Sequence, residues 1–143
     1  MRPAAEEVVA AARAWLGTPY RHRASVRGAG CDCLGLLRGV WRSLYGSEPL
    51  PVPNYRADAR DHAGSLQRAA ERLLVAVEGT PQAGDVVLFR LRPGAPPRHC
   101  GIIVGPLRFI HAQEGLGVVE ASIGDSWQRR LAGLYRFPEA RTC

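Results

Sequence analysis

A cysteine and two histidines carry the chemistry that this sequence offers. Cys33 follows residues 30–32 (GCD) and opens an apolar stretch with helical spacing, so we expect it at a helix N-terminus. The partial positive charge and unpaired N–H groups there favour the thiolate, which is the nucleophilic form of cysteine. His99 and His111 follow in strand-like segments. A thiol beside an imidazole base, with a third group that orients the imidazole, is typical of nucleophilic acyl transfer.

The spacing of the two histidines predicts that they share one face of a hairpin. Residues 105–107 (GPL) separate their strands, and proline is disfavoured at the second central position of a tight turn. A three-residue loop over 105–107 instead pairs His111 with Gly101. His99 and His111 then become diagonal neighbours, roughly 7–8 Å apart. Cys100 points to the opposite face, which favours His99 as the functional member of that pair.

Each of these residues also has an ordinary structural interpretation. A free cysteine is most often a small buried hydrophobe, and a strand histidine is most often a hydrogen-bonded part of the core. Asp32 suits the N-cap of the helix, where it would compete with the Cys33 thiolate for first-turn N–H groups. Tyr20 suits a core position. The joint spacing of Cys33, His99 and His111 favours the catalytic interpretation.

A metal site is the alternative use of the same residue types. The candidate ligands are Cys31, Cys33, His99, Cys100 and Cys143. Structural zinc sites usually take ligands in two pairs with two to four residues in each spacing. The first two cysteines are too close for that pattern, and alternation along a strand sends His99 and Cys100 to opposite faces. We therefore expect no metal and no cofactor, and we expect Cys143 to take no part.

Composition limits the class of protein. The chain has 143 residues, which suits a single domain over 1–143, and its net charge of +6 is carried by arginine alone. The arginines are scattered, which favours a solvated basic surface over a patch that binds nucleic acid. The apolar runs are too short to span a membrane, and the N-terminus carries acids where a secretory signal is basic and then apolar. We therefore expect no nucleic-acid partner, no membrane insertion and synthesis in the cytoplasm without a signal peptide.

The elements that position these residues fall into a helical half and a strand half. The spacing predicts helices over about 4–16, 33–45 and 60–74, with an extended connector over 49–53. Strands are predicted over 86–91, 100–104, 108–113, 117–122 and 134–137. Helices followed by strands are typical of an α+β domain, here with N-terminal helices packed on a mostly antiparallel sheet of about five strands.

Two features of the predicted helices define how they should pack. In the first helix, the inward face is formed by Val8, Ala12, Trp15 and Leu16. In the second helix, the inward stripe is formed by Leu34, Leu37, Trp41 and Leu44. Gly35 and Gly39 lie on one face of the second helix and lower its helix propensity, so we expect a neighbour packed closely against them.

Five segments, taken in order, resemble the NlpC-type cell-wall cysteine peptidases. They are residues 17–21 (GTPYR), 31–36 (CDCLGL), 84–89 (GDVVLF), 99–105 (HCGIIVG) and 108–112 (RFIHA). The resemblance runs from about residue 7 to residue 137. It implies a papain-like fold and hydrolysis of peptide bonds in peptidoglycan stem peptides, commonly the γ-D-glutamyl–diaminopimelate bond.

The resemblance also implies roles for single residues. Cys33 matches the nucleophile, His99 the general base and His111 the polar residue that orients the base. Tyr20 matches the tyrosine that lines the substrate cleft. Asp32 matches the aspartate before the nucleophile, so both are candidate substrate-binding residues.

The segment around Cys33 differs from many family members at one position and is similar to one subgroup of the family. Leu34 stands where many members have serine, which changes the polar contacts of the substrate beside the nucleophile. The segment CDCLGL is similar to a subgroup encoded with phage tails and gene transfer agents. That similarity implies tail-tip or baseplate partners and action in the periplasm or cell wall from a phage-like tail. A structural tail or baseplate protein with a vestigial site, and an amidase or acyltransferase on the same scaffold, are the alternatives.

Overall fold

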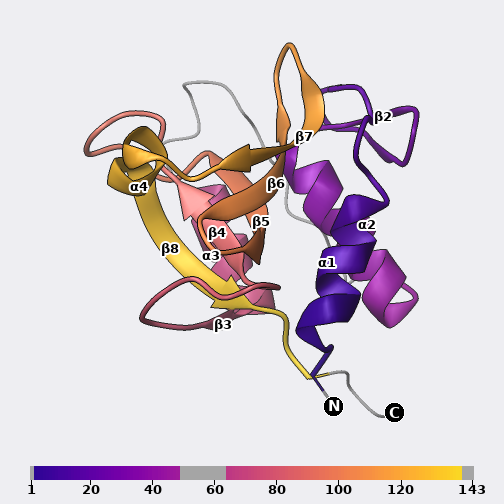
Figure 1. Ribbon diagram of the computed structural model, residues 1–143, viewed down its shortest axis with the longest axis horizontal. Coiled ribbons are helices and arrows are strands. Elements are labelled where there is room, and N and C mark those ends of the chain that lie inside the picture. Colours follow the sequence, from indigo (N-terminus) through magenta and orange to yellow (C-terminus); the bar gives the residue numbers. More distant parts are fainter. Residues whose placement is uncertain (1, 49–63, 140–143) are drawn as a thin grey trace.

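One antiparallel sheet, with helices on both sides, organises the computed structural model, which describes residues 2–48 and 64–139. The helices are α1 (Ala5–Arg13), α2 (Cys33–Tyr45), α3 (Ser65–Leu73) and α4 (Asp125–Arg130). The strands are β1 (Ser25–Val26), β2 (Gly30–Cys31), β3 (Val75–Ala76), β4 (Val86–Phe89), β5 (His99–Gly105), β6 (Arg108–Gln113), β7 (Gly117–Ser122) and β8 (Leu131–Arg136). Figure 1 shows α1 and α2 together on one side of the sheet and α4 on the other.

The sheet has the strand order β3-β8-β4-β5-β6-β7, and its neighbouring strands are antiparallel. A separate antiparallel pair, β1 and β2, precedes α2. The predicted α+β architecture with an antiparallel sheet is therefore confirmed. The described sheet has six strands rather than about five, because the two-residue strand β3 adds an edge that is too short to give an alternating pattern in the sequence.

Alternation along the strands produces two cores. On the helix-covered face, Val86, Ile102 and Ile110 pack with Leu36 and other residues of the helices. On the opposite face, a second cluster forms around residues one position along each strand. Its buried members are Val87, Phe89, Ile103, Phe109, Ile123 and Leu134, and Trp127 and Leu131 pack against them. The sheet therefore separates two distinct environments.

The glycines of α2 bring it into close contact with the preceding chain, as predicted. A Cβ at Gly39 would overlap the ring of Trp15, and a Cβ at Gly35 would overlap the carbonyl oxygen of Ala24. These contacts turn Leu36 and Val40 fully inward, with 1% and 0% of their surfaces exposed. The predicted stripe (Leu34, Leu37, Trp41 and Leu44) is only partly buried against the same core. The inward face of α2 is therefore rotated from the prediction towards the glycines.

Several predicted boundaries differ from the structure. Helix α1 ends at Arg13, three residues before the predicted end, and Leu16 is 42% exposed rather than inward. Helix α4 and the pair of β1 and β2 were not predicted, because their short segments lack apolar periodicity. The connector over 49–53, the first residues of the third predicted helix and Cys143 lie outside the described residues.

Candidate active site

Cys33 is the first residue of α2, as the sequence predicts, and Asp32 is the N-cap. Oδ1 of Asp32 accepts a hydrogen bond from the backbone N–H of Gly35, and Oδ2 accepts one from Arg23, both at 2.7 Å. The side chain is 2% exposed. Burial raises the pKa of Asp32, and the two backbone hydrogen bonds oppose that change. This geometry joins the loop before the helix to its first turn.

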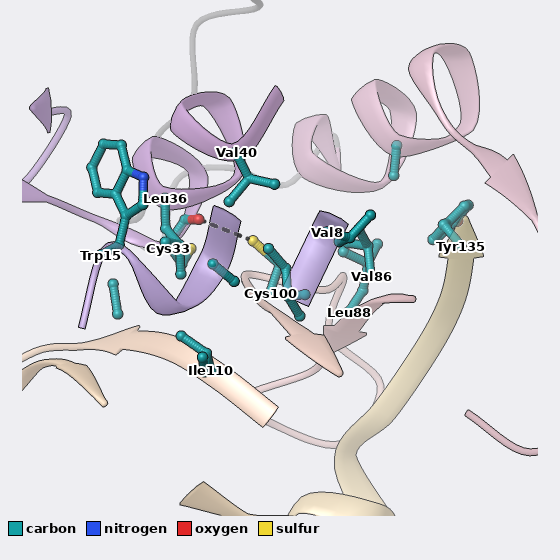
Figure 2. Packing of buried hydrophobic residues seen from close by; sticks show 14 of the residues in the cluster. Val8, Trp15, Cys33, Leu36, Val40, Val86, Leu88, Cys100, Ile110 and Tyr135 are labelled. Carbon is teal, nitrogen blue, oxygen red and sulfur yellow. Dashed lines mark hydrogen bonds between the residues drawn. The ribbon is translucent and has the colours of Figure 1, made fainter. Parts of the chain in front are cut away.

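The Cys33 side chain lies where the start of α2 meets the start of β5. Its Sγ donates to the carbonyl oxygen of Arg98 at 3.8 Å, and 4% of the residue is exposed. Cys100, which follows His99 on β5, donates from Sγ to the carbonyl oxygen of Cys33 at 3.3 Å (Figure 2). These contacts hold the helix start against the residues on either side of His99.

The two neighbouring thiols remain protonated at neutral pH. A hydrogen bond with Cys33, followed by burial, raises the pKa of Cys100 well above its usual value. Burial, with the charges of Asp32 and Cys33 next, raises the pKa of Cys31 to about 12. Since the thiolate is the reactive form, Cys31 and Cys100 are poor nucleophiles. Among the described cysteines, Cys33 is therefore the best candidate for the nucleophile, because it lies at the helix start.

His99 and His111 lie on one face of the β5–β6 hairpin, and their rings are in contact. Nε2 of His99 is 2.8 Å from Nδ1 of His111, and the two ring planes are 81° apart. The strand register matches the prediction, since Ile102 pairs with Ile110. A Cβ at Gly101 would lie 3.2 Å from Cβ of His111, so the glycine leaves room for the imidazole opposite it.

The loop that connects the histidine strands differs from the prediction. Gly105 pairs directly with Arg108, which leaves a two-residue turn of Pro106 and Leu107. Proline then occupies the first central position, where its fixed φ is favourable. A bulge between Ile103 and Gly105 restores the predicted register. The shared face was correctly predicted, although the turn was not.

His111 is fully buried, with 0% of its surface exposed. Burial, with the charge of His99 second, lowers its pKa to about 3 from 6.5, so it is neutral near pH 7. Within residues 2–48 and 64–139, its Nε2 has no hydrogen-bond partner. A neutral imidazole carries one N–H, so His111 can either donate to or accept from His99, but it cannot share the charge of an imidazolium.

Aromatic rings surround the histidine pair. Phe109 stacks on His111 with ring centroids 4.3 Å apart, and Phe89 lies 6.3 Å from His99. Trp127, from α4, contacts both imidazoles. Phe109 is two residues from His111 on one strand, so alternation indicates that contact. Trp127 could not be predicted from the sequence, because a six-residue helix after a loop has no pattern that places its side chains.

Tyr20 lies beside the segment that leads into α2. It forms a parallel bridge with Cys31, whose N–H donates to the carbonyl oxygen of Pro19 at 3.0 Å. Burial, followed by the charge of Cys33, raises the pKa of Tyr20 to about 12. The phenol is therefore protonated at neutral pH and can donate a hydrogen bond. The structure thus brings Tyr20 close to the start of α2.

The described residues give no sign of a metal centre or a membrane span. No three of their His, Cys, Asp and Glu side chains gather closely enough to hold a metal ion. None of the four described helices is long and apolar enough to cross a membrane.

The antiparallel sheet, with the candidate cysteine at a helix start packed on it, defines a papain-like α+β fold. The chain belongs to the NlpC/P60 family, whose model matches residues 17–136. The crystal structure of a family member from Bacillus cereus superposes with a TM-score of 0.70 at 24% identity, over 96% of this chain and 41% of that one. The NlpC/p60 domain of the peptidoglycan hydrolase SagA superposes with a TM-score of 0.65 at 25% identity, over 94% of this chain and all of that one.

Curated relatives show the same membership. The chain is 32% identical over 127 residues to the Escherichia coli K12 protein named murein DD-endopeptidase MepS/murein LD-carboxypeptidase, covering 89% of this chain and 56% of the relative. It is 30% identical over 135 residues to the γ-DL-glutamyl hydrolase of Bacillus subtilis 168, covering 91% and 29%. The chain thus spans at most about half the length of these relatives.

Proposed function

We propose that this chain is a cysteine peptidase that hydrolyses peptide bonds in peptidoglycan. The observation that carries the proposal is the 2.8 Å contact between His99 and His111. The residues on either side of His99, Arg98 and Cys100, are hydrogen-bonded to Cys33 at the helix start. Membership of the NlpC/P60 family and the names of two relatives, a murein DD-endopeptidase and a probable peptidoglycan endopeptidase, support the substrate class.

Cys33 is the nucleophile in this proposal, and His99 is the base. Because Nε2 of His99 is engaged by His111, Nδ1 is the nitrogen that takes the thiol proton. The thiolate attacks the amide carbonyl carbon, and the N–H groups at the start of α2 stabilise the oxyanion. The His99 imidazolium then gives its proton to the leaving amine, which leaves a thioester. Water, deprotonated by His99, hydrolyses the thioester and releases the acid and the thiol.

His111 orients His99 rather than exchanging protons with the substrate. If His99 donates from Nε2, His111 accepts at Nδ1 and carries its own proton on Nε2. This arrangement serves both charge states of His99, since Nδ1 gains and loses the catalytic proton while the Nε2 hydrogen bond persists. The low pKa of His111 keeps its Nδ1 available as an acceptor.

The proposed scissile bond is the γ-D-glutamyl–diaminopimelate bond. One relative is named a γ-DL-glutamyl hydrolase, whereas another is named a DD-endopeptidase and LD-carboxypeptidase, so neighbouring stem-peptide bonds are the alternatives. Tyr20 lines the cleft in this proposal and donates its phenol to substrate. Leu34 packs against the core beside Cys33 and supplies no polar contact there.

Digestion of defined wall fragments, in which the stem peptide is still attached to its sugar, tests the function and the bond together. Purified chain should cleave a peptide with γ-D-glutamyl–diaminopimelate linkage, with products identified by mass spectrometry, and Cys33→Ala should leave it intact. Cleavage between the sugar and the peptide would identify an amidase instead. No cleavage of any wall fragment would favour a structural protein with a vestigial site.

The similarity of CDCLGL to tail-associated family members supports a proposed context. The chain would act on the periplasmic side of the wall as part of a phage-like tail, with a tail-tip or baseplate protein as its partner. Affinity purification from producing cells should recover such proteins together with the chain. Recovery of the chain free of any particle would contradict this context without affecting the proposed chemistry.

A further inference from the structure

One indole ring covers both partners of the His99–His111 hydrogen bond. The centroid of Trp127 is 5.5 Å from that of His99, and their planes are nearly parallel at 28°. The same ring is 5.4 Å from His111 and nearly perpendicular to it at 79°. The guanidinium carbon of Arg130, one turn further along α4, lies 5.7 Å from the indole centroid. Because the two imidazole planes are nearly perpendicular, the indole ring stacks on His99 and lies edge-on to His111.

Exposure distinguishes Trp127 from the other rings around the pair. Phe89, Phe109 and His111 are each 0% exposed, whereas Trp127 is partly exposed. Among the described aromatic rings that contact the pair, Trp127 is thus the one that reaches solvent. Water competes for imidazole N–H groups and weakens a hydrogen bond that a dry environment strengthens. Loss of the indole would open the hydrogen bond to water and free the His99 ring to rotate.

We propose that Trp127 is a positioning residue that holds the His99 imidazole on His111 and keeps its Nδ1 directed at the thiol. The inference rests on the proposed roles of Cys33 and His99. Trp127 touches neither the thiol nor the substrate in this proposal. It acts through His99, by stacking on the ring and by excluding water from Nε2.

The test measures the Cys33 thiol directly and so does not depend on a peptide substrate. The rate of Cys33 alkylation by iodoacetamide at pH 7, resolved by peptide mass spectrometry, is compared for the natural chain, Trp127→Phe, Trp127→Leu and Trp127→Met. Loss of the stacked ring should slow alkylation about tenfold in the Leu and Met variants, because a mispositioned imidazole supports less thiolate. Trp127→Phe retains a ring and should recover most of the rate.

Trp41→Leu is the matched control. Trp41 is also partly exposed, but it packs against Tyr45 and Phe137 on α2's side of the molecule. This variant should lose a comparable packing energy while alkylation stays within about twofold of the natural chain. In hydrolysis assays, Trp127→Leu should lower kcat and leave KM unchanged, since the indole orients the base rather than binding substrate.

Each outcome separates this inference from the proposed function. Equal alkylation rates for the natural chain and whichever of Trp127→Leu and Trp127→Met folds would overturn the positioning role, even if hydrolysis is observed. An equal loss in Trp41→Leu would reduce the effect to general stability and would also overturn it. If no wall peptide is cleaved but Trp127 variants still alkylate slowly and Trp127→Phe rapidly, the positioning role stands and the proposed substrate fails.

Discussion

The helix-covered face of the sheet holds the candidate nucleophile among mostly aliphatic side chains, whereas the opposite face holds the candidate histidines among aromatic rings. The two environments meet at the start of β5. There Cys100 points to the helix side and bonds to Cys33, while His99 points to the ring side and contacts His111. Consecutive residues of one strand thus connect a helix start to an oriented imidazole.

The difference between the faces matches what each candidate group needs. A cysteine nucleophile gains from the N–H groups and partial charge of a helix N-terminus, which the helix side provides. An oriented imidazole gains from rigid walls and the exclusion of water, which flat rings provide at little entropic cost. Perturbing each face in turn should therefore produce different kinds of defect.

The largest effect is expected when the candidate nucleophile, on the helix-covered side of the sheet, is removed. Cys33→Ala should lower hydrolysis of wall peptides by about 10⁴-fold or more, as is typical when a covalent nucleophile is deleted. Cys31→Ala and Cys143→Ala should retain most of the activity, since the thiol of Cys31 is held protonated. Release of product by each purified variant, measured by mass spectrometry, checks this. Activity in Cys33→Ala would refute the assignment of the nucleophile.

The second-largest expected effect comes from removing His111 on the aromatic side of the sheet, which leaves the Cys33 thiol in place. His111→Ala should lower kcat by about 10²–10³-fold, because His99 loses the group that fixes its orientation. His111→Asn, which still offers an amide oxygen as acceptor, should recover part of the loss. Steady-state kinetics on one stem peptide compares the variants. A change in KM alone would show that His111 serves substrate binding instead.

The site was predictable where its geometry is local or follows alternation. Cys33 at the helix start follows from an N-cap residue and apolar spacing, and the shared face of His99 and His111 follows from strand parity. The position of Trp127 depends on where the short helix α4 packs against the sheet, and no local sequence pattern predicts that. The bulge beside Val104 could not be predicted from the sequence either, because several turn geometries give the same strand register.

The helices show the same limit. The apolar residues of α2 cover a wide arc, and periodicity predicted Leu34 and Leu37 as the inward residues, whereas Leu36 and Val40 lie deepest. The close approach of Trp15 to Gly39 decides which residues lie deepest, and that contact joins segments of the chain separated by a loop. The glycines predicted close packing, although they did not identify the neighbour.

A smaller effect tests that packing on the helix side. Gly39→Ala gains about 1 kcal/mol of helix propensity, but its Cβ would overlap the Trp15 ring. Overpacking costs about 1–3 kcal/mol, so we expect a net loss of stability in urea unfolding. Trp15→Phe in the same chain should recover part of it, because the smaller ring leaves space. Gly105→Ala, which meets no atom within 4 Å, is the control. Additive costs for the double variant would contradict the proposed contact.

The smallest effect is a pH dependence that belongs to the ring side. Burial, followed by the charge of His99, lowers the pKa of His111 to about 3 from 6.5. Between these values the unfolded chain binds a proton at His111 and the folded chain does not. The contribution of neutral His111 to the free energy of unfolding is therefore at its maximum above about pH 6.5 and falls as the pH decreases towards 3. Between pH 7 and 5.5 the loss should reach up to about 1.3 kcal/mol.

Urea unfolding of the natural chain and of His111→Gln at both pH values measures this difference, because the other titrating groups are common to the two proteins. The glutamine variant lacks the titrating imidazole, so its stability should fall less between pH 7 and 5.5. Parallel losses in the natural chain and His111→Gln would show that the folded protein protonates His111 as readily as the unfolded chain does. The aromatic surroundings would then not be the dry environment that distinguishes this face from the helix-covered one.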